Sequence, residues 1–130
     1  MSSQDIPDEL PISMEDVRIL SQEYWRLNSL AALLKNSSEG VALRRIVRSL
    51  NGILSGLDIE VIDLTGSPYE PGMAPDVIDI REDRELADGL SIIDEYIAPT
   101  VAWRGRILIP GQIILRRSYV TTPDNSKVVE

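Results

Sequence analysis

The sequence predicts an α+β protein in which a helical hairpin is followed by a small all-β module. Apolar residues recur at helical spacing up to Leu57, and beyond Gly56 they change to the spacing of short strands. With 130 residues and 43% hydrophobic content, the chain can bury one ordinary core. The predicted parts are a disordered arm at 1–12, a helical hairpin that dimerises at 13–57, a β-domain at 58–118 and a flexible tail at 119–130.

A heptad-like seam marks the first predicted helix, which begins after an arm that contains two prolines. Ser13 and Asp16 have the spacing of a capping box, in which the hydroxyl accepts a helix N–H and the carboxylate faces the positive end of the helix. Apolar residues then alternate at spacings of three and four, which is typical of a seam between packed helices. These residues are Val17, Leu20, Tyr24, Leu27, Ala31 and Leu34.

The second predicted helix follows the turn segment KNSSEG, with a cap at Ser37 or Ser38 and a stop at Gly56 and Asp58. A hairpin of two helices buries too little apolar surface to be stable alone. The β region or an identical hairpin in a dimeric four-helix bundle could cover it, and we expect the dimer. The expected dimerisation residues are Val17, Leu20, Tyr24, Leu27, Leu34 and Leu50.

Short strands separated by turn residues are predicted from residue 59 onward. Thr65 to Pro68 have turn chemistry, the charged run REDRELADG reads as a turn or loop, and Pro99 interrupts a ladder. Gly105 lies between two further short strands, and Pro110-Gly111 precedes the last. The predicted strands are residues 59–64, 76–80, 90–97, 101–104, 106–109 and 112–116.

Composition excludes several kinds of partner. A net charge of −8 and a pI of about 4.5 disfavour nucleic acid, because binding a phosphate backbone needs a basic face. No apolar run approaches the roughly 20 residues of a membrane span, and the acidic start is unlike a secretory signal. We therefore expect a cytoplasmic protein that binds neither membrane nor nucleic acid. Acidic residues concentrate in 58–96, whereas 43–57 and 99–117 carry only arginines as charged residues.

An enzyme is not expected, since the chain has no Cys and no His. General-base chemistry would fall to carboxylates or to Lys35 and Lys127, and no phosphate-binding glycine motif is present. One acidic group could hold Mg²⁺ or Ca²⁺, but it lacks the Gly and the terminal Glu of an EF-hand loop, so we expect a solvated turn and no cofactor or metal. This group is Asp76, Asp79, Glu82, Asp83 and Glu85.

Two segments carry a resemblance to a known family. GLDIEVIDLTGSPYEPGMAPDVI, followed by WRGRILIPGQIIL, resembles the C-terminal part of GrpE, the nucleotide exchange factor of DnaK-class chaperones. The family's aromatic-Asp-Pro loop is matched by Gly66, Tyr69, Glu70 and Pro71. Its late Gly-Arg pattern is matched by Gly105, Arg106, Pro110, Gly111 and Ile113. The resemblance covers about residues 43–116. This sequence departs from the family in three places. Glu70 replaces the family's aspartate, and Ala74 and Asp76 replace the family's histidine and alanine. The family's long stalk helix is absent or reduced to 13–36.

The resemblance implies that the β-module binds the nucleotide-binding domain of a DnaK-like, actin-fold ATPase and promotes ADP release. The alternative is a non-catalytic assembly adaptor that uses the same surface, and a distant third is a carboxylate-metal hydrolase. Two interpretations without a binding function also stay open. In one, Tyr69-Glu70-Pro71 only stiffens a loop. In the other, the hairpin tip at 104–106 is only solvated. The expected partner-binding residues are Arg106, Arg104, Trp103, Ile97, Leu115, Tyr69, Glu70 and Met73.

Overall fold

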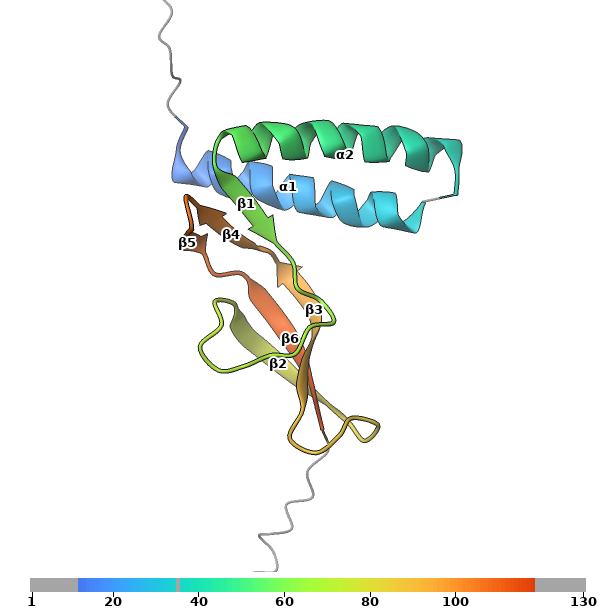
Figure 1. Ribbon diagram of the computed structural model, residues 1–130, viewed down its shortest axis with the longest axis vertical. Helices are drawn as coiled ribbons and strands as arrows, with labels where there is room; N and C mark the ends of the chain where they lie inside the picture. The colour runs from blue at the N-terminus through green and yellow to red at the C-terminus, as the bar shows by residue number, and fades with distance from the viewer. Residues whose placement is uncertain (1–11, 35, 119–130) are drawn as a thin grey trace, which may run out of the picture. The chain divides into compact units, whose positions relative to one another are not determined.

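The computed structural model describes residues 12–34 and 36–118, and it confirms a mixed α+β fold of two helices followed by six strands in two small sheets (Figure 1). The chain divides into two compact units, Met1–Val47 and Arg48–Glu130. The boundary falls inside the second helix, so each unit is described by itself.

Serine caps start both helices. In α1, Met14–Leu33, the Ser13 hydroxyl accepts the Asp16 N–H at 3.0 Å, as the sequence predicts. Before α2, Ser38–Gly56, Ser37 Oγ accepts the Gly40 N–H at 2.9 Å. The turn between the helices is tight, because a Cβ built at Gly40 would lie 1.6 Å from the Leu34 carbonyl oxygen.

The expected dimerisation residues differ in exposure. Val17 is buried in the single chain, as is the seam residue Ala31. Leu34 is exposed, and the other four are half-buried, namely Leu20, Tyr24, Leu27 and Leu50. Val17 and Ala31 are thus already removed from water without a second copy, and the dimeric bundle stays a prediction.

The first sheet, sheet A, holds three short antiparallel strands in the order β1-β4-β5. Its buried residues are Ile59, Val101, Ala102 and Thr100. All three strands lie within a residue or two of the predicted ranges. They are β1, Ile59–Ile62, β4, Thr100–Trp103, and β5, Arg106–Ile109.

The second sheet, sheet B, has β6 between β2 and β3, parallel to β2 and antiparallel to β3 (Figure 1). The sequence did not predict the parallel pair. The core of this sheet contains Ile93, Tyr96, Ile113 and Leu115. The strands are β2, Asp76–Asp83, β3, Ser91–Ala98, and β6, Gln112–Ser118.

The charged run after residue 80 is a correction to the prediction, because its first three residues are strand and not loop. Arg81 to Asp83 pair in parallel with Arg116 to Ser118 of β6. The charges of Arg81 and Asp83 are compensated across the sheet by ion pairs with Asp94 and Arg116, and these pairs let a charged segment continue the ladder.

Glycine is required where the chain passes from sheet A back to sheet B. Gly111 follows β5 and has a φ of 83°. A Cβ there would lie 2.8 Å from both the N and the Oγ1 of Thr100, and Thr100 is itself buried. Any other residue would therefore combine a left-handed backbone with a steric clash.

The proline-containing loop between β1 and β2 is attached to the outer edge of β3. Gly66 N–H donates to the Ile93 carbonyl at 2.8 Å, and Ile93 N–H donates to the Ser67 carbonyl at 2.9 Å. Tyr69 N–H donates to the Ser91 carbonyl at 2.8 Å. These three bonds fix residues 66–69 in place, in addition to any stiffening by the prolines.

Candidate functional site

The turn between β4 and β5 has an unusual residue for its conformation. Arg104 and Gly105 both have positive φ, 51° and 79°, as a two-residue type I′ hairpin requires. Such turns favour Asn-Gly, and a left-handed backbone costs a residue with a Cβ about 1 to 2 kcal/mol. Arginine therefore occupies a position where it is unfavourable for the fold.

Asp58 meets this arginine from the end of α2. It also has a left-handed backbone, with a φ of 63°, and these are the two non-glycine residues with positive φ in the described part of the chain. Arg104 N–H donates to the Asp58 carbonyl at 3.0 Å, and Arg104 Nε lies 3.4 Å from Asp58 Oδ2. Two residues separated by 46 positions thus fix each other at one corner of sheet A.

An aromatic ring supports the guanidinium group. The Arg104 Cζ lies 4.5 Å from the centroid of the Trp103 ring, which is a cation–π distance. Trp103 is half-buried and pairs across the strands with Arg106, whose side chain is exposed. Ile107 follows Arg106 in β5 and is 49% exposed. This end of the hairpin, which we call the 103–107 tip, presents two cations, an indole and an aliphatic side chain.

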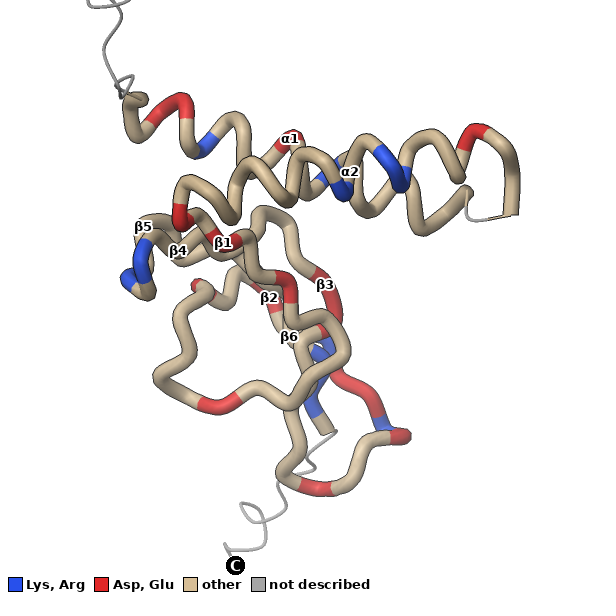
Figure 2. The backbone as a smooth tube through the Cα atoms, turned by 45° about the horizontal axis from the view of Figure 1, so that its top comes forward, with Lys and Arg blue, Asp and Glu red and all other residues tan. Residues whose placement is uncertain are grey.

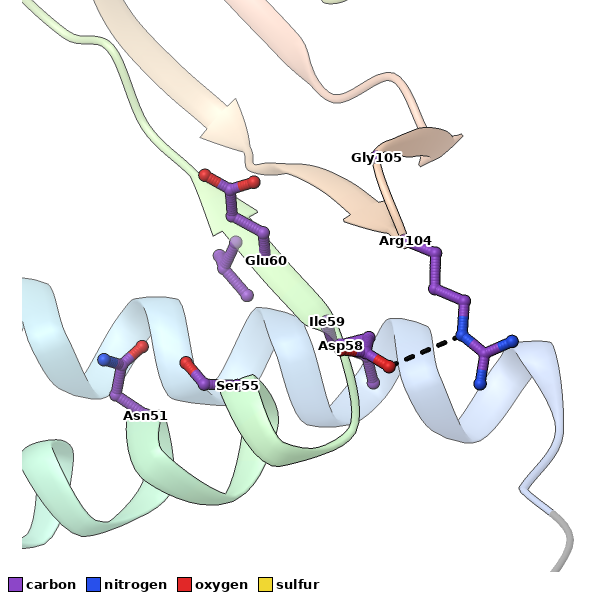
Figure 3. Close-up of a pocket in the computed structure, with 8 residues that line it drawn as sticks. Asn51, Ser55, Asp58, Ile59, Glu60, Arg104 and Gly105 are labelled. Carbon is purple, nitrogen blue, oxygen red and sulfur yellow. Dashed lines mark hydrogen bonds and ion pairs between the residues drawn. The ribbon is translucent and has the colours of Figure 1, made fainter.

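A shallow concavity of about 550 Å³ lies beside the tip (Figure 3). Asp58 and Arg104 face each other on its wall, and Glu60 from β1 adds a second carboxylate. Its other lining residues are Asn51, Ser55, Ile59, Val61 and Gly105. A mostly polar wall with both signs of charge suits a polar side chain of another protein better than a buried apolar ligand.

A second polar cluster ties the strands of sheet B together. Arg116 on β6 contacts Asp83 on β2 at 3.0 Å and Asp94 on β3 at 3.1 Å. Arg81 contacts Asp94 at 2.7 Å. The pKa of Asp83 is lowered, first by the hydrogen bond from the Glu85 backbone N–H and then by the one from Arg116. Since each charge has an opposite partner, we assign this cluster to strand pairing.

Charge is only partly segregated in the second unit, because Arg116 and Arg117 of β6 lie between the acidic strands β2 and β3. Figure 2 shows acidic residues along β2, β3 and their connection, and basic residues where β4 turns into β5. A partner surface that is complementary to the 103–107 tip would be acidic.

Six of the eight expected partner-binding residues fall into two groups. Trp103, Arg104 and Arg106 are together at the tip. A second group lies in the loop at 66–75, where the Met73 N–H donates to the Glu70 carbonyl at 3.2 Å and the Tyr69 backbone is bonded to β3.

Two further expected residues lie on sheet B. Ile97 on β3 is 40% exposed. Leu115 is a correction, because it lies in the middle of β6 between Ile80 and Ile93 and is only 5% exposed. Its apolar character reflects the core of sheet B, so no partner reaches its side chain unless the sheet opens.

Sequence reasoning missed Asp58, Glu60 and Ile107. The sequence indicates Asp58 only as a helix stop, and an aspartate just after a helix end does tolerate the left-handed conformation. Its contact with Arg104 has no local signal, since it depends on the pairing of β1 with β4. The Arg-Gly dipeptide between two short strands was the one available sign of a strained turn.

Among the described residues, no group of three or more acidic side chains is arranged to hold a metal ion. Neither described helix combines the length and apolar character needed to cross a membrane. A comparison with models of known protein families gave no match, and a comparison with curated protein sequences gave none.

Proposed function

We propose that this chain is a non-enzymatic, cytoplasmic protein that binds a DnaK-like, actin-fold ATPase through the 103–107 tip and promotes ADP release. The observation that carries the proposal is the left-handed Arg104, held between Asp58 and Trp103. Backbone strain is retained mainly at positions where function needs the residue. A glycine or an asparagine would form the same turn at lower cost, so the advantage of arginine at this position is its guanidinium group.

The tip has the chemistry of a protein-binding hot spot. Arg and Trp are enriched among residues whose truncation weakens complexes most, and here they are already stacked. Holding the arginine in one geometry before binding lowers the entropy lost on association. Arg106, which pairs with Trp103 across the hairpin, extends the same surface with a second charge.

The nature of the partner rests on the resemblance to GrpE, which places Arg106 in the family's late Gly-Arg pattern. An exchange factor acts by binding the open form of the ATPase better than the closed, ADP-bound form. The shift in the equilibrium equals that difference in affinity, so no chemistry by this chain is needed. An acidic patch on the nucleotide-binding domain is the expected complement of the tip.

In this proposal α1 and α2 form a helical hairpin, and two copies of the hairpin form the dimer. Ile46, Ile53 and Leu57 are exposed on α2, and with half-buried Leu50 they recur at spacings of four and three. An antiparallel α2 from a second copy, centred between Ser49 and Leu50, would place Ile46 opposite Ile53. It would also place Ala42, a small residue, opposite Leu57, and alternation of small and large residues favours close packing.

The proposal is tested by ADP release from the DnaK-class ATPase of the same organism. The ATPase is loaded with a fluorescent ADP analogue, and the full-length chain is added with excess unlabelled nucleotide. Faster loss of fluorescence supports an exchange factor. Binding without a change in the release rate favours the second candidate, an assembly adaptor that uses the same tip. Absence of binding at micromolar concentrations contradicts both.

A further inference from the structure

The outer edge of β2 is the longest unpaired strand edge in the described part of the chain. β2 pairs with β6 on one side only, whereas the loop at 66–69 covers residues 91–93 of the outer edge of β3. The outer strands of sheet A, β1 and β5, have four residues each, but β2 has eight, or about 26 Å of backbone. A strand edge of this length is a template for another strand.

The side chains of β2 combine exposed aliphatic and acidic groups. Ile78 is 50% exposed and Ile80 is 40% exposed, although both are β-branched residues suited to packing on a neighbouring strand. Asp83 is already paired with Arg116. The remaining acidic residues, which have no ion pair in the described structure, are Asp76, Asp79 and Glu82.

Charge decides which segment can occupy this edge. β2 carries four acidic residues against Arg81 alone, and Arg81 is already engaged by Asp94 and Glu95. A second β2 would therefore add mainly like charges, and cross-strand pairs of like charge are destabilising. The arm at 1–12 and the tail at 119–130 of this chain are each net acidic in sequence and are excluded on the same ground. We propose that the outer edge of β2 binds an extended, basic and β-branched segment of another protein as an added strand.

In the free protein, the side chain of Asp79 accepts a hydrogen bond from one backbone N–H of β2. Asp79 Oδ1 accepts the N–H of Ile80 at 2.9 Å, and this bond is exposed. An incoming strand can take its place, which frees the Asp79 carboxylate to meet a lysine or arginine of that strand. The main chain would then supply affinity, and the acidic residues would reject neutral and acidic strands.

The test uses the full-length chain and a fluorescent peptide of nine residues in which lysine alternates with valine. We expect saturable binding and slower exchange of β2 amide protons in the complex. Matched peptides are one in which glutamate replaces lysine, and one in which alternate backbone nitrogens are methylated to remove the hydrogen-bond donors. Both should bind at least about tenfold more weakly, because one lacks the charge complement and the other the ladder.

Variants of the protein can distinguish binding at the edge of β2 from attraction to the acidic surface in general. Asp76→Lys combined with Glu82→Lys should weaken the lysine–valine peptide by about tenfold. Glu85→Lys combined with Asp88→Lys is the control with the same change in net charge, because both are exposed acids in the β2–β3 connection outside the strand. Equal weakening by both changes, equal binding of the methylated peptide, or no binding of the lysine–valine peptide would each overturn the proposal.

Discussion

Arg104 occupies a backbone conformation that disfavours it, and its function can be separated from its contribution to stability. Arg104→Asn keeps a side chain that tolerates positive φ and forms the preferred Asn-Gly turn. Relief of up to about 1 kcal/mol of strain should offset the loss of the Trp103 stack and of the exposed Asp58 ion pair, each worth about 0.5 kcal/mol. We expect urea unfolding to give a free energy equal to or above that of the wild type, with weaker partner binding. A loss of more than about 1 kcal/mol would make Arg104 a structural residue.

Two glycines with similar backbones differ in their surroundings, and they form a matched pair for mutagenesis. Gly105 has open space around the position of a Cβ, whereas Gly111 faces Thr100 at 2.8 Å. Gly105→Ala should cost about 1 to 2 kcal/mol from strain alone, and Gly111→Ala about 3 kcal/mol from strain and overpacking. Urea unfolding of both variants measures the difference. Equal losses would show that the passage between the sheets can relax around a methyl group.

At the residue scale, the sequence predicts types of environment better than contacts. Trp103, Arg104 and Arg106 were expected to lie together because they are neighbours in a short hairpin, and they do. Leu115 was expected on the surface, but it lies in the middle strand of sheet B, between β2 and β3, and is buried. The contact between Asp58 and Arg104 depends on long-range strand pairing, which single residues do not encode.

At the scale of elements, the loop at 66–69 provides a test of local rigidity. Gly66 and Tyr69 donate backbone hydrogen bonds to β3, whereas the exposed Gly72 donates none within the described chain. Hydrogen exchange followed by NMR should therefore be slower at Gly66 and Tyr69 than at Gly72. Fast exchange at all three amides would mean that the loop opens independently of sheet B.

The ion-pair cluster of sheet B should make the stability of the fold depend on pH in the acidic range. The pKa of Asp83 is lower in the folded chain than its ordinary value, so the ionised form stabilises the fold. That contribution is complete above about pH 4 and is lost as the pH falls through the lowered, folded-state pKa. We expect thermal stability to fall in this acidic window, and Asp83→Asn to lower stability at neutral pH while making the acid dependence shallower.

The control for this change is Asp88→Asn, at an exposed site outside the cluster. Its thermal unfolding should follow that of the wild type across the same pH range. An unchanged acid dependence in Asp83→Asn would assign the sensitivity to other carboxylates.

Periodicity was sufficient to predict both helices and all six strands, because helix caps, glycines and prolines punctuate this chain clearly. It could not predict that β2 runs parallel to β6. A parallel partner lies far away in sequence, and the local pattern of either strand is the same in both arrangements. The extension of β2 into the charged run likewise depends on arginines contributed by another strand.

At the scale of the whole molecule, the exposed apolar stripe of α2 predicts a dimer in solution. Ile53→Glu would place a charge opposite Ile46 within the proposed contact between two copies. We expect light scattering to give a dimer mass for the wild type at micromolar concentration and a monomer mass for the variant. Arg48→Glu, on the opposite side of α2, is the control and should remain a dimer. A monomeric wild type with full helicity would contradict the predicted bundle.

The most direct test of the central claim is the affinity of the ATPase for Arg106→Ala, measured by calorimetry beside Arg45→Ala. Arg106 is exposed at the tip, and Arg45 is exposed on α2 in the other unit, so both changes remove one arginine from the surface. If the tip is the contact face, Arg106→Ala should weaken binding at least about tenfold, as expected for an arginine that loses water in a complex. Arg45→Ala should bind like the wild type. Wild-type affinity of Arg106→Ala together with a loss in Arg45→Ala would contradict the account and would move the contact face to the helices.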